Sequence, residues 1–199
     1  MILIAPNECI CPVCEKSAIG GATHPRCRGR YTPDGLTSFF YYGAVVREAV
    51  KSIKYRFVYD LVSEFVSLVP DACIGRLPMN DERLVVVPIP LHSSRLRFRG
   101  FNQAEKLGAV LAIRLHLQIN TGILTRTRKT NPQVEMKKKE DRLKNMENVF
   151  TTQHSEFPMH NSGILLFDDV FTTGATMRAA TKELKRAGVP FVWCVTMAR

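Results

Sequence analysis

The stretch from Gly163 to Met177 limits the possible folds of this 199-residue chain more than any other part of it. It begins with an apolar run, Ile164 to Phe167, of the kind that forms a buried strand in a parallel sheet. Two adjacent carboxylates, Asp168 and Asp169, follow where that strand should end. A threonine-rich turn comes next, and the residues after it are apolar at the three- and four-residue spacing of a helix. A strand, a polar turn and a helix in this order predict an α/β fold.

The turn itself has the composition of a phosphate-binding site. A helix N-terminus offers backbone N–H groups and the positive end of the helix dipole, and both favour a phosphate. Gly174 allows the backbone to approach that phosphate closely, while Thr172, Thr173 and Thr176 can donate hydrogen bonds from their hydroxyls. A phosphate would repel the two carboxylates, so we expect them to face vicinal sugar hydroxyls, directly or through Mg²⁺.

These residues closely resemble the phosphoribosyl pyrophosphate (PRPP) signature of type I phosphoribosyltransferases. The signature consists of a short apolar run, two acids, two spacer residues, and then Thr-Thr-Gly with a small residue after it. The resemblance implies that Asp168 and Asp169 are catalytic residues that contact the ribose 2′- and 3′-hydroxyls, and that Mg²⁺ accompanies PRPP. It implies that the 5′-phosphate is held by Thr172, Thr173, Gly174, Ala175 and Thr176. The alternative is an ordinary strand-to-helix loop, but order, spacing and chemistry agree over the whole stretch.

Two pairs of candidate metal ligands lie near the start of the chain. Cys11 and Cys14 form a Cys-x-x-Cys pair, and His24 and Cys27 form a second pair with the same spacing. Two such pairs on tight turns can surround one tetrahedral Zn²⁺ with three sulfurs and one nitrogen. A shell of four protein ligands leaves no open position for catalysis, so we expect a structural zinc site. Free thiols in a loop are the alternative, and Cys9 could replace one of the four ligands.

The chain length, composition and net charge limit the size of the fold, the type of ligand and the location of the protein. With 199 residues, 45% of them hydrophobic, the chain can form one medium domain and a small additional module. We expect a zinc-binding module over residues 1–35 and an α/β domain over residues 36–199. The formal net charge of +10 favours polyanions such as PRPP, pyrophosphate or nucleic acid. Residues 1–6 lack the pattern of a signal peptide, and no apolar run is long enough to cross a membrane, so we expect a cytoplasmic protein.

Residues 36–70 predict an aromatic run followed by two amphipathic helices. On the first helix Arg47, Lys51 and Lys54 lie opposite the apolar face, where a solvated surface is favoured over a nucleic-acid patch. Residues 71–83 carry Pro, Gly, Asn and Asp, and therefore predict a connecting loop.

Residues 84–90 predict a second buried strand, which ends at its prolines. Arg95, Arg97 and Arg99 alternate in the segment after it, and this pattern predicts a loop that binds anions. Asn102 is the predicted N-cap of the helix that follows, because Glu105 comes three residues later.

The segment Val87-Pro88-Ile89-Pro90, followed by Arg99-Gly100-Phe101-Asn102-Gln103, resembles the ComF (ComF/GntX) family of competence-associated proteins. Together with the two ligand pairs and the PRPP signature, the resemblance covers essentially the whole chain. Further agreement lies between Arg126 and Phe150. One departure is His24, where the family more often has cysteine; imidazole is an equally good zinc ligand.

The resemblance implies a type I phosphoribosyltransferase fold, in which helices flank a Rossmann-like parallel sheet and the ligand binds at the carboxyl ends of the strands. The loop after the strand at 84–90 would contact pyrophosphate, and residues 125–145 would form a lid over PRPP. For His92, a hydrogen bond within its own loop is the alternative to a role as general base. The candidates for loop and lid are Pro90, Leu91, His92, Arg99, Arg126, Arg128 and Lys129.

The resemblance leaves two functions open. The first is Mg²⁺-dependent transfer of the phosphoribosyl group from PRPP with release of pyrophosphate, serving DNA uptake in natural competence. The second is a non-catalytic protein of the DNA-uptake machinery that binds single-stranded DNA and uses PRPP as a regulatory ligand. Base stacking would require exposed aromatic side chains, for which Tyr55, Phe57 and Phe101 are candidates. No pattern in the sequence identifies the acceptor of a transferase.

Overall fold

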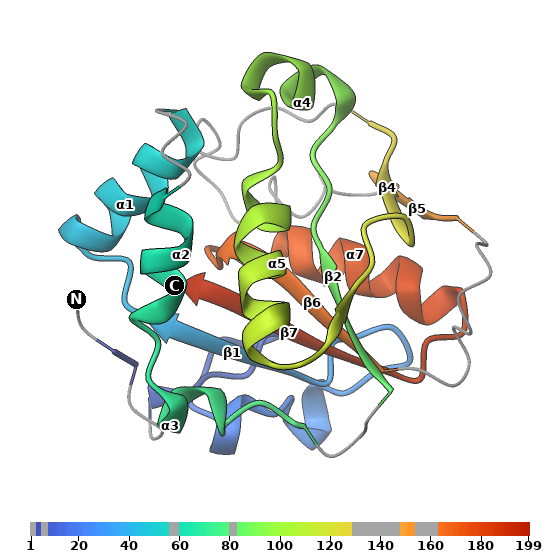
Figure 1. Cartoon of the computed structure of the whole chain (residues 1–199). Coiled ribbons are helices and arrows are strands. Elements are labelled where there is room, and N and C mark those ends of the chain that lie inside the picture. Colours follow the sequence, from blue (N-terminus) through green and yellow to red (C-terminus); the bar gives the residue numbers. More distant parts are fainter. Residues whose placement is uncertain (1–2, 5–7, 56–59, 80–82, 129–147, 154–162) are drawn as a thin grey trace.

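The computed structural model describes residues 3–4, 8–55, 60–79, 83–128, 148–153 and 163–199 (Figure 1). A five-stranded sheet with the strand order β1-β7-β6-β2-β3 forms the centre of the fold, and all its neighbouring strands are parallel. Its strands are β1 (Gly35–Phe40), β2 (Leu84–Pro88), β3 (Gln118–Ile119), β6 (Gly163–Val170) and β7 (Phe191–Ala198). A second, antiparallel sheet consists of β4 (Leu124–Arg126) and β5 (Phe150–Thr152).

Helices cover both faces of the central sheet (Figure 1). On β6, Leu165 and Phe167 belong to an apolar cluster shared with α1, α2 and α5, whereas Ile164 and Leu166 belong to a second cluster shared with α7. Successive side chains of a strand point to opposite faces, so a continuous apolar run suits a strand buried on both. The helices are α1 (Ala44–Tyr55), α2 (Asp60–Ser67), α3 (Asp71–Ile74), α4 (Ser93–Arg99), α5 (Gln103–Arg114) and α7 (Ala175–Arg186), with 3₁₀ turns η2 (Ile19–Gly21) and η3 (Pro25–Cys27). The α/β fold predicted from the sequence is confirmed.

The helix N-cap predicted at Asn102 is also confirmed. Its side-chain oxygen accepts a hydrogen bond from the Ala104 N–H at 3.1 Å, at the start of α5. Its Nδ2 donates to the Ile89 carbonyl oxygen at 3.0 Å, just after β2. One buried side chain therefore starts α5 and fixes it to the carboxyl end of β2.

One of the predicted loops is a helix. Residues 93–99, expected as an arginine-rich loop, form α4. Its N-cap His92 accepts a hydrogen bond from the Ser94 N–H at 3.2 Å, and its C-cap Gly100 has the left-handed φ of 76°. Favourable caps at both ends explain why this short segment is helical.

One further expectation from the middle of the chain needs correction, and one segment that was given no secondary structure is a strand. The predicted loop at residues 71–83 begins with the single-turn helix α3, and Asp71 in its first turn complements the helix dipole. Phe39 and Phe40 of the aromatic run belong to strand β1. This strand is buried along its whole length, so it lacks the alternation of apolar and polar residues by which half-exposed strands are recognised.

The N-terminal residues pack against β1, the edge strand of the sheet, and contact its neighbour β7. The Asp34 carboxylate accepts a hydrogen bond from Lys185 Nζ of α7 at 2.7 Å. Gly35 lies against Trp193 so closely that a Cβ at Gly35 would be 2.2 Å from the indole ring. The Trp193 Nε1–H donates to the Thr37 hydroxyl at 2.9 Å. Among the residues that the structure describes, no helix has the length and apolar character to span a membrane.

Candidate functional site

A cavity of about 390 Å³ lies at the carboxyl ends of β2 and β6. The end of β6, the turn after it and the first residues of α7 form one part of its wall. Side chains from α1, α4, α5 and β4 complete the lining. Ligands of open α/β sheets bind at this edge, because the connections there diverge and leave a crevice.

The turn between β6 and α7 brings the backbone into the cavity. Gly174 is the N-cap of α7 and has a φ of 68°, in the left-handed region that favours glycine. A Cβ at Gly174 would lie 2.6 Å from the Phe171 ring, so the position admits no larger residue without rearrangement. The turn therefore presents the start of a twelve-residue helix to the cavity, in the arrangement that suits a phosphate.

The two adjacent carboxylates at the end of β6 lie in different environments. Asp168 is half-buried, and its Oδ1 accepts a hydrogen bond from the Asp169 N–H at 2.9 Å. Burial, followed by the neighbouring charge of Asp169, raises the pKa of Asp168 to about 7. Asp169 is buried, and its Oδ2 lies 2.6 Å from Lys54 Nζ in an ion pair. Asp168 is thus the more accessible carboxylate.

Cationic side chains outnumber these carboxylates around the cavity. Burial tends to lower the pKa of Lys54, but the adjacent Asp169 raises it above its usual value, so Lys54 stays charged. Burial and the nearby charge of Arg95 lower the pKa of Arg126 to about 10, which still leaves it charged at neutral pH. With Arg99, these residues give the cavity four cations against two carboxylates among the lining residues described. The excess positive charge favours an anionic ligand.

The structure brings most of the residues predicted for the phosphoribosyl ligand into one cavity. Those that line it are Asp168, Asp169, Thr172, Gly174, Ala175, Thr176, Leu91, Arg99 and Arg126. Thr173, Pro90, His92 and Arg128 are not part of the lining, and Lys129 lies outside the described residues. The ring of His92 is engaged locally, with its Nδ1 2.8 Å from the Ser94 hydroxyl, as the alternative interpretation of this histidine expected.

The position of Lys54 was not predicted from the sequence. It was expected on a solvated helix face together with Arg47 and Lys51, which are indeed exposed. Lys54 instead lies in the last turn of α1 and reaches Asp169, more than a hundred residues away in sequence. No local pattern signals this contact, because it depends on how α1 packs against the end of β6.

A second missed residue is Phe98. It is 82% exposed on α4, whereas Phe101, one of the predicted base-stacking residues, is buried. Phe57 and the side chain of Tyr55 lie outside the described residues. The alternation of arginine with Leu96 and Phe98 was a possible signal for an exposed amphipathic segment.

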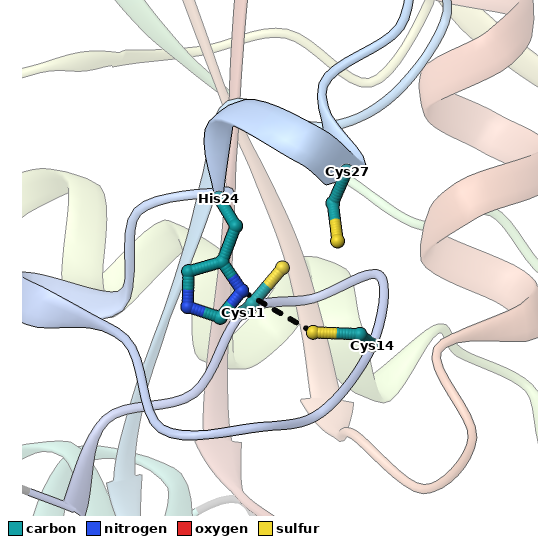
Figure 2. A group of neighbouring side chains, drawn as sticks. All are labelled: Cys11, Cys14, His24 and Cys27. Carbon is teal, nitrogen blue, oxygen red and sulfur yellow. Dashed lines mark hydrogen bonds between the residues drawn. The ribbon is translucent and has the colours of Figure 1, made fainter.

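The four predicted metal ligands converge in the N-terminal part of the chain. The donor atoms of Cys11, Cys14, His24 and Cys27 all lie within 4.8 Å of one another (Figure 2). His24 Nδ1 faces Cys14 Sγ at 3.3 Å, and His24 Nε2 lies 2.9 Å from the Ser17 carbonyl oxygen. A carbonyl accepts but does not donate, so Nε2 carries the proton and the Nδ1 lone pair points into the cluster.

This donor set fits a tetrahedral zinc ion. Three sulfurs and one nitrogen are the usual ligands of structural zinc, and the carbonyl behind His24 supplies the outer contact that fixes an imidazole ligand. Burial would raise the pKa of Cys11, but hydrogen bonds from the backbone of Cys14, His24 and Val13 lower it to about 7. Ligation requires such a thiolate. The cluster as the structure shows it does not include Cys9.

One arginine connects the cysteine cluster with the turn at the cavity. Arg178 Nη2 donates to the Thr173 carbonyl oxygen at 2.7 Å and lies 3.7 Å from Glu15 Oε1. Glu15 follows Cys14 directly, has the positive φ of 61°, and donates its N–H to the Cys11 carbonyl oxygen at 2.9 Å. The bend of the Cys-x-x-Cys turn therefore places the carboxylate that meets Arg178.

Comparison with known proteins gives the family. No protein-family model matches the chain. Competence protein ComFC of Bacillus subtilis is 30% identical over 189 residues, which cover 90% of this chain and 72% of that protein. Competence protein F of Haemophilus influenzae is 34% identical over 116 residues, or 57% of this chain and 49% of that protein. DNA utilization protein YhgH of Escherichia coli is 35% identical over 112 residues, or 55% and 48%.

The similarity to ComFC extends over most of both chains, while the other two relatives match over about half of their own length. It accompanies the same order of elements that suggested the family from the sequence, with the Cys/His cluster before the sheet and the acidic pair at the end of β6. The chain therefore belongs to the ComF family.

Proposed function

We propose that the cavity binds PRPP and that the protein transfers its phosphoribosyl group to an acceptor, in the service of DNA uptake. The observation that carries this proposal is the position of the acidic pair, together with Thr172, Gly174, Ala175 and Thr176, on one wall of a cavity with excess positive charge. DNA uptake enters because the relatives are named as competence and DNA utilization proteins. Such a function would be carried out in the cytoplasm.

The proposed roles follow from charge. When the bond between C1′ and pyrophosphate breaks, pyrophosphate leaves with the electron pair and positive charge develops on the ribose ring. Asp168, the more exposed of the two carboxylates, would orient a ribose hydroxyl and offset that charge. Arg95, Arg99 and Arg126 would stabilise the leaving pyrophosphate. Mg²⁺ would neutralise part of the charge of the diphosphate. The acceptor would then form its bond to C1′ and release its proton to the departing pyrophosphate or to solvent.

We further propose that zinc occupies the Cys/His cluster and stabilises a module formed by residues 1–35. The convergence of the four donors and the outer contact of His24 support this structural role.

Calorimetric titration of PRPP with Mg²⁺ tests the proposal for the cavity. Wild type should bind PRPP, and Asp168→Asn/Asp169→Asn should lose at least about tenfold in affinity, since each lost charged hydrogen bond is worth ~1.5–3 kcal/mol. Asp71→Asn is the matched control, because Asp71 is an exposed carboxylate on α3, away from the cavity. Equal affinity in wild type and the double variant would refute the site. Pyrophosphate release with a panel of nucleobases and amines then tests turnover.

A second function, binding of single-stranded DNA, is favoured by one specific observation. Phe98 is 82% exposed and Leu96 is 42% exposed on α4, interleaved with Arg95, Arg97 and Arg99. An aromatic face surrounded by arginines is suited to stack on a base while the arginines contact phosphates. In this case PRPP would be a ligand that regulates a DNA-binding protein.

Fluorescence anisotropy with a labelled single-stranded oligonucleotide tests this second function. At near-physiological salt, Phe98→Ala should weaken binding by roughly fivefold or more, since base stacking is worth ~1–3 kcal/mol. Ile113→Ala is the control, because Ile113 is 75% exposed on α5. If Phe98→Ala and Ile113→Ala bind equally, or if wild-type binding vanishes at that salt, the attraction is only that of net charge.

A further inference from the structure

We propose that Lys54 serves as the built-in cation of the acidic pair, so that no divalent ion binds at Asp168 and Asp169, and any Mg²⁺ arrives on the diphosphate of the ligand. Because of Lys54, the cavity would bind the ligand together with any Mg²⁺ already on its diphosphate, and would not bind Mg²⁺ beforehand. The identity of the diphosphate ligand rests on the proposed function. The absence of a divalent ion at Asp168 and Asp169 does not depend on it.

The contact between Lys54 and Asp169 is close and shielded from solvent. Lys54 Nζ lies 2.6 Å from Asp169 Oδ2, and the exposed fractions of the two side chains are 21% and 6%. Charges in such a site interact more strongly than at a surface, because little water screens them. A divalent ion at Oδ2 of Asp169 would have to displace this ammonium group first.

The position of Lys54 is set by packing and not by a ligand. Val46, Val50 and Ile53 of α1 are all buried in the cluster that also contains Phe167 of β6. Asp169 follows Phe167 by two residues and therefore points to the same face of the sheet. The helix that carries Lys54 is thus fixed against the strand that carries Asp169, and the ion pair forms as part of the fold.

The other carboxylate is also a poor metal ligand. One oxygen of Asp168 already accepts the Asp169 N–H at 2.9 Å. Burial, followed by the charge of Asp169, raises its pKa to about 7, while the positive charges of Lys54 and Arg126 act in the opposite direction. Together with Arg95 and Arg99, the cavity holds four cations near two carboxylates, so a divalent ion would add to an existing excess of positive charge.

The inference is tested by titrating zinc-loaded protein with Mn²⁺ in the absence of any other ligand, at pH 8. Electron paramagnetic resonance measures the bound Mn²⁺. Wild type and Asp169→Asn should bind Mn²⁺ equally weakly, because no ion sits on the acidic pair. Lys54→Met should gain Mn²⁺ affinity by roughly tenfold or more, because it removes a competing positive charge next to the carboxylate, and Lys54→Met/Asp169→Asn should lose that gain. Lys51→Met is the matched control, since Lys51 is an exposed lysine on the same helix. A wild-type Mn²⁺ site that Asp169→Asn removes would overturn the inference, as would a folded Lys54→Met protein without the gain.

Ribose 5-phosphate, which has no diphosphate, separates this inference from the proposed function. Its affinity for wild type should be the same with Mg²⁺ as with a chelator, whereas Lys54→Met should bind it better with Mg²⁺. An affinity of wild type that depends on Mg²⁺ would contradict the role of Lys54. Absence of ribose 5-phosphate and PRPP binding would instead remove the proposed function, and the Mn²⁺ titration would still decide the role of Lys54. If Lys54→Met does not fold, the comparison of wild type with Asp169→Asn decides alone.

Discussion

The cysteine cluster and the cavity are both groups of polar side chains, but they require ligands of opposite charge. In the cluster, three sulfurs and one imidazole nitrogen converge within 4.8 Å, and such a set of electron-pair donors requires a cation. In the cavity, two carboxylates face four cationic side chains, and such a set requires an anion. The two regions therefore take ligands of opposite charge, and Arg178 joins them through Glu15 on one side and Thr173 on the other.

The largest effect should come from breaking the cluster. Cys11→Ser removes a buried ligand, so we expect loss of bound zinc and a decrease of more than ~4 kcal/mol in the free energy of unfolding, as is typical when a structural metal is lost. Metal analysis and thermal unfolding measure both. Cys9→Ser should keep one zinc per chain, because Cys9 lies outside the cluster. Zinc bound equally by Cys11→Ser would show that these four residues are not the ligands.

The next effect should come from the turn at the cavity. Gly174→Ala places a Cβ on a backbone with left-handed φ and against the Phe171 ring, which should lower the free energy of unfolding by ~1–3 kcal/mol. We expect weaker PRPP binding in calorimetry while the zinc content stays unchanged. Gly43→Ala is the control, because a Cβ there would have no neighbour within 4 Å. Equal PRPP affinity of the two variants would mean that the turn does not hold the phosphate.

Arg178 tests whether the two regions are connected. Arg178→Met leaves the Thr173 carbonyl oxygen without this hydrogen-bond donor. We therefore expect the free energy of unfolding to fall by ~1–2 kcal/mol and PRPP binding to weaken, while zinc stays bound. Glu15→Gln should lower the free energy of unfolding by less than ~1 kcal/mol, since the ion pair of Glu15 with Arg178 is 3.7 Å long and partly exposed. Arg186→Met, in an exposed ion pair on the same helix, should leave PRPP binding unchanged. Were Arg178→Met to bind PRPP like Arg186→Met, the connection would have no role at the cavity.

The smallest effect concerns pH. Because the pKa of Asp168 is raised to about 7, the folded protein keeps a proton that the unfolded chain releases at about pH 4. The stability contributed by this group therefore falls as pH rises from about 4 to about 7. Asp168→Asn should become more stable relative to wild type over this range, by about 1 kcal/mol in total, because water in the cavity screens the charge. Chemical denaturation of both proteins across the range measures this, and a constant difference would contradict it.

The sequence predicted what depends on neighbours along the chain. The strand, turn and helix around Asp168 and the N-cap at Asn102 are local patterns, and the spacing of the cysteine pairs limits how they can fold. The contact of Lys54 with Asp169 was missed because it joins two elements brought together only by packing of the core. The helical state of α4 depends on its caps at His92 and Gly100, which an alternating arginine pattern does not reveal.

The contact between Gly35 and the indole ring has a practical consequence. Trp193 is the single tryptophan of the chain and is 8% exposed where the N-terminal residues meet the sheet. Its fluorescence is therefore an intrinsic reporter of that boundary. If removing zinc with a chelator loosens only the cysteine-bearing turns, the emission maximum should stay at short wavelength. If the residues before Gly35 detach from β7, the indole becomes hydrated and the emission should shift to the red.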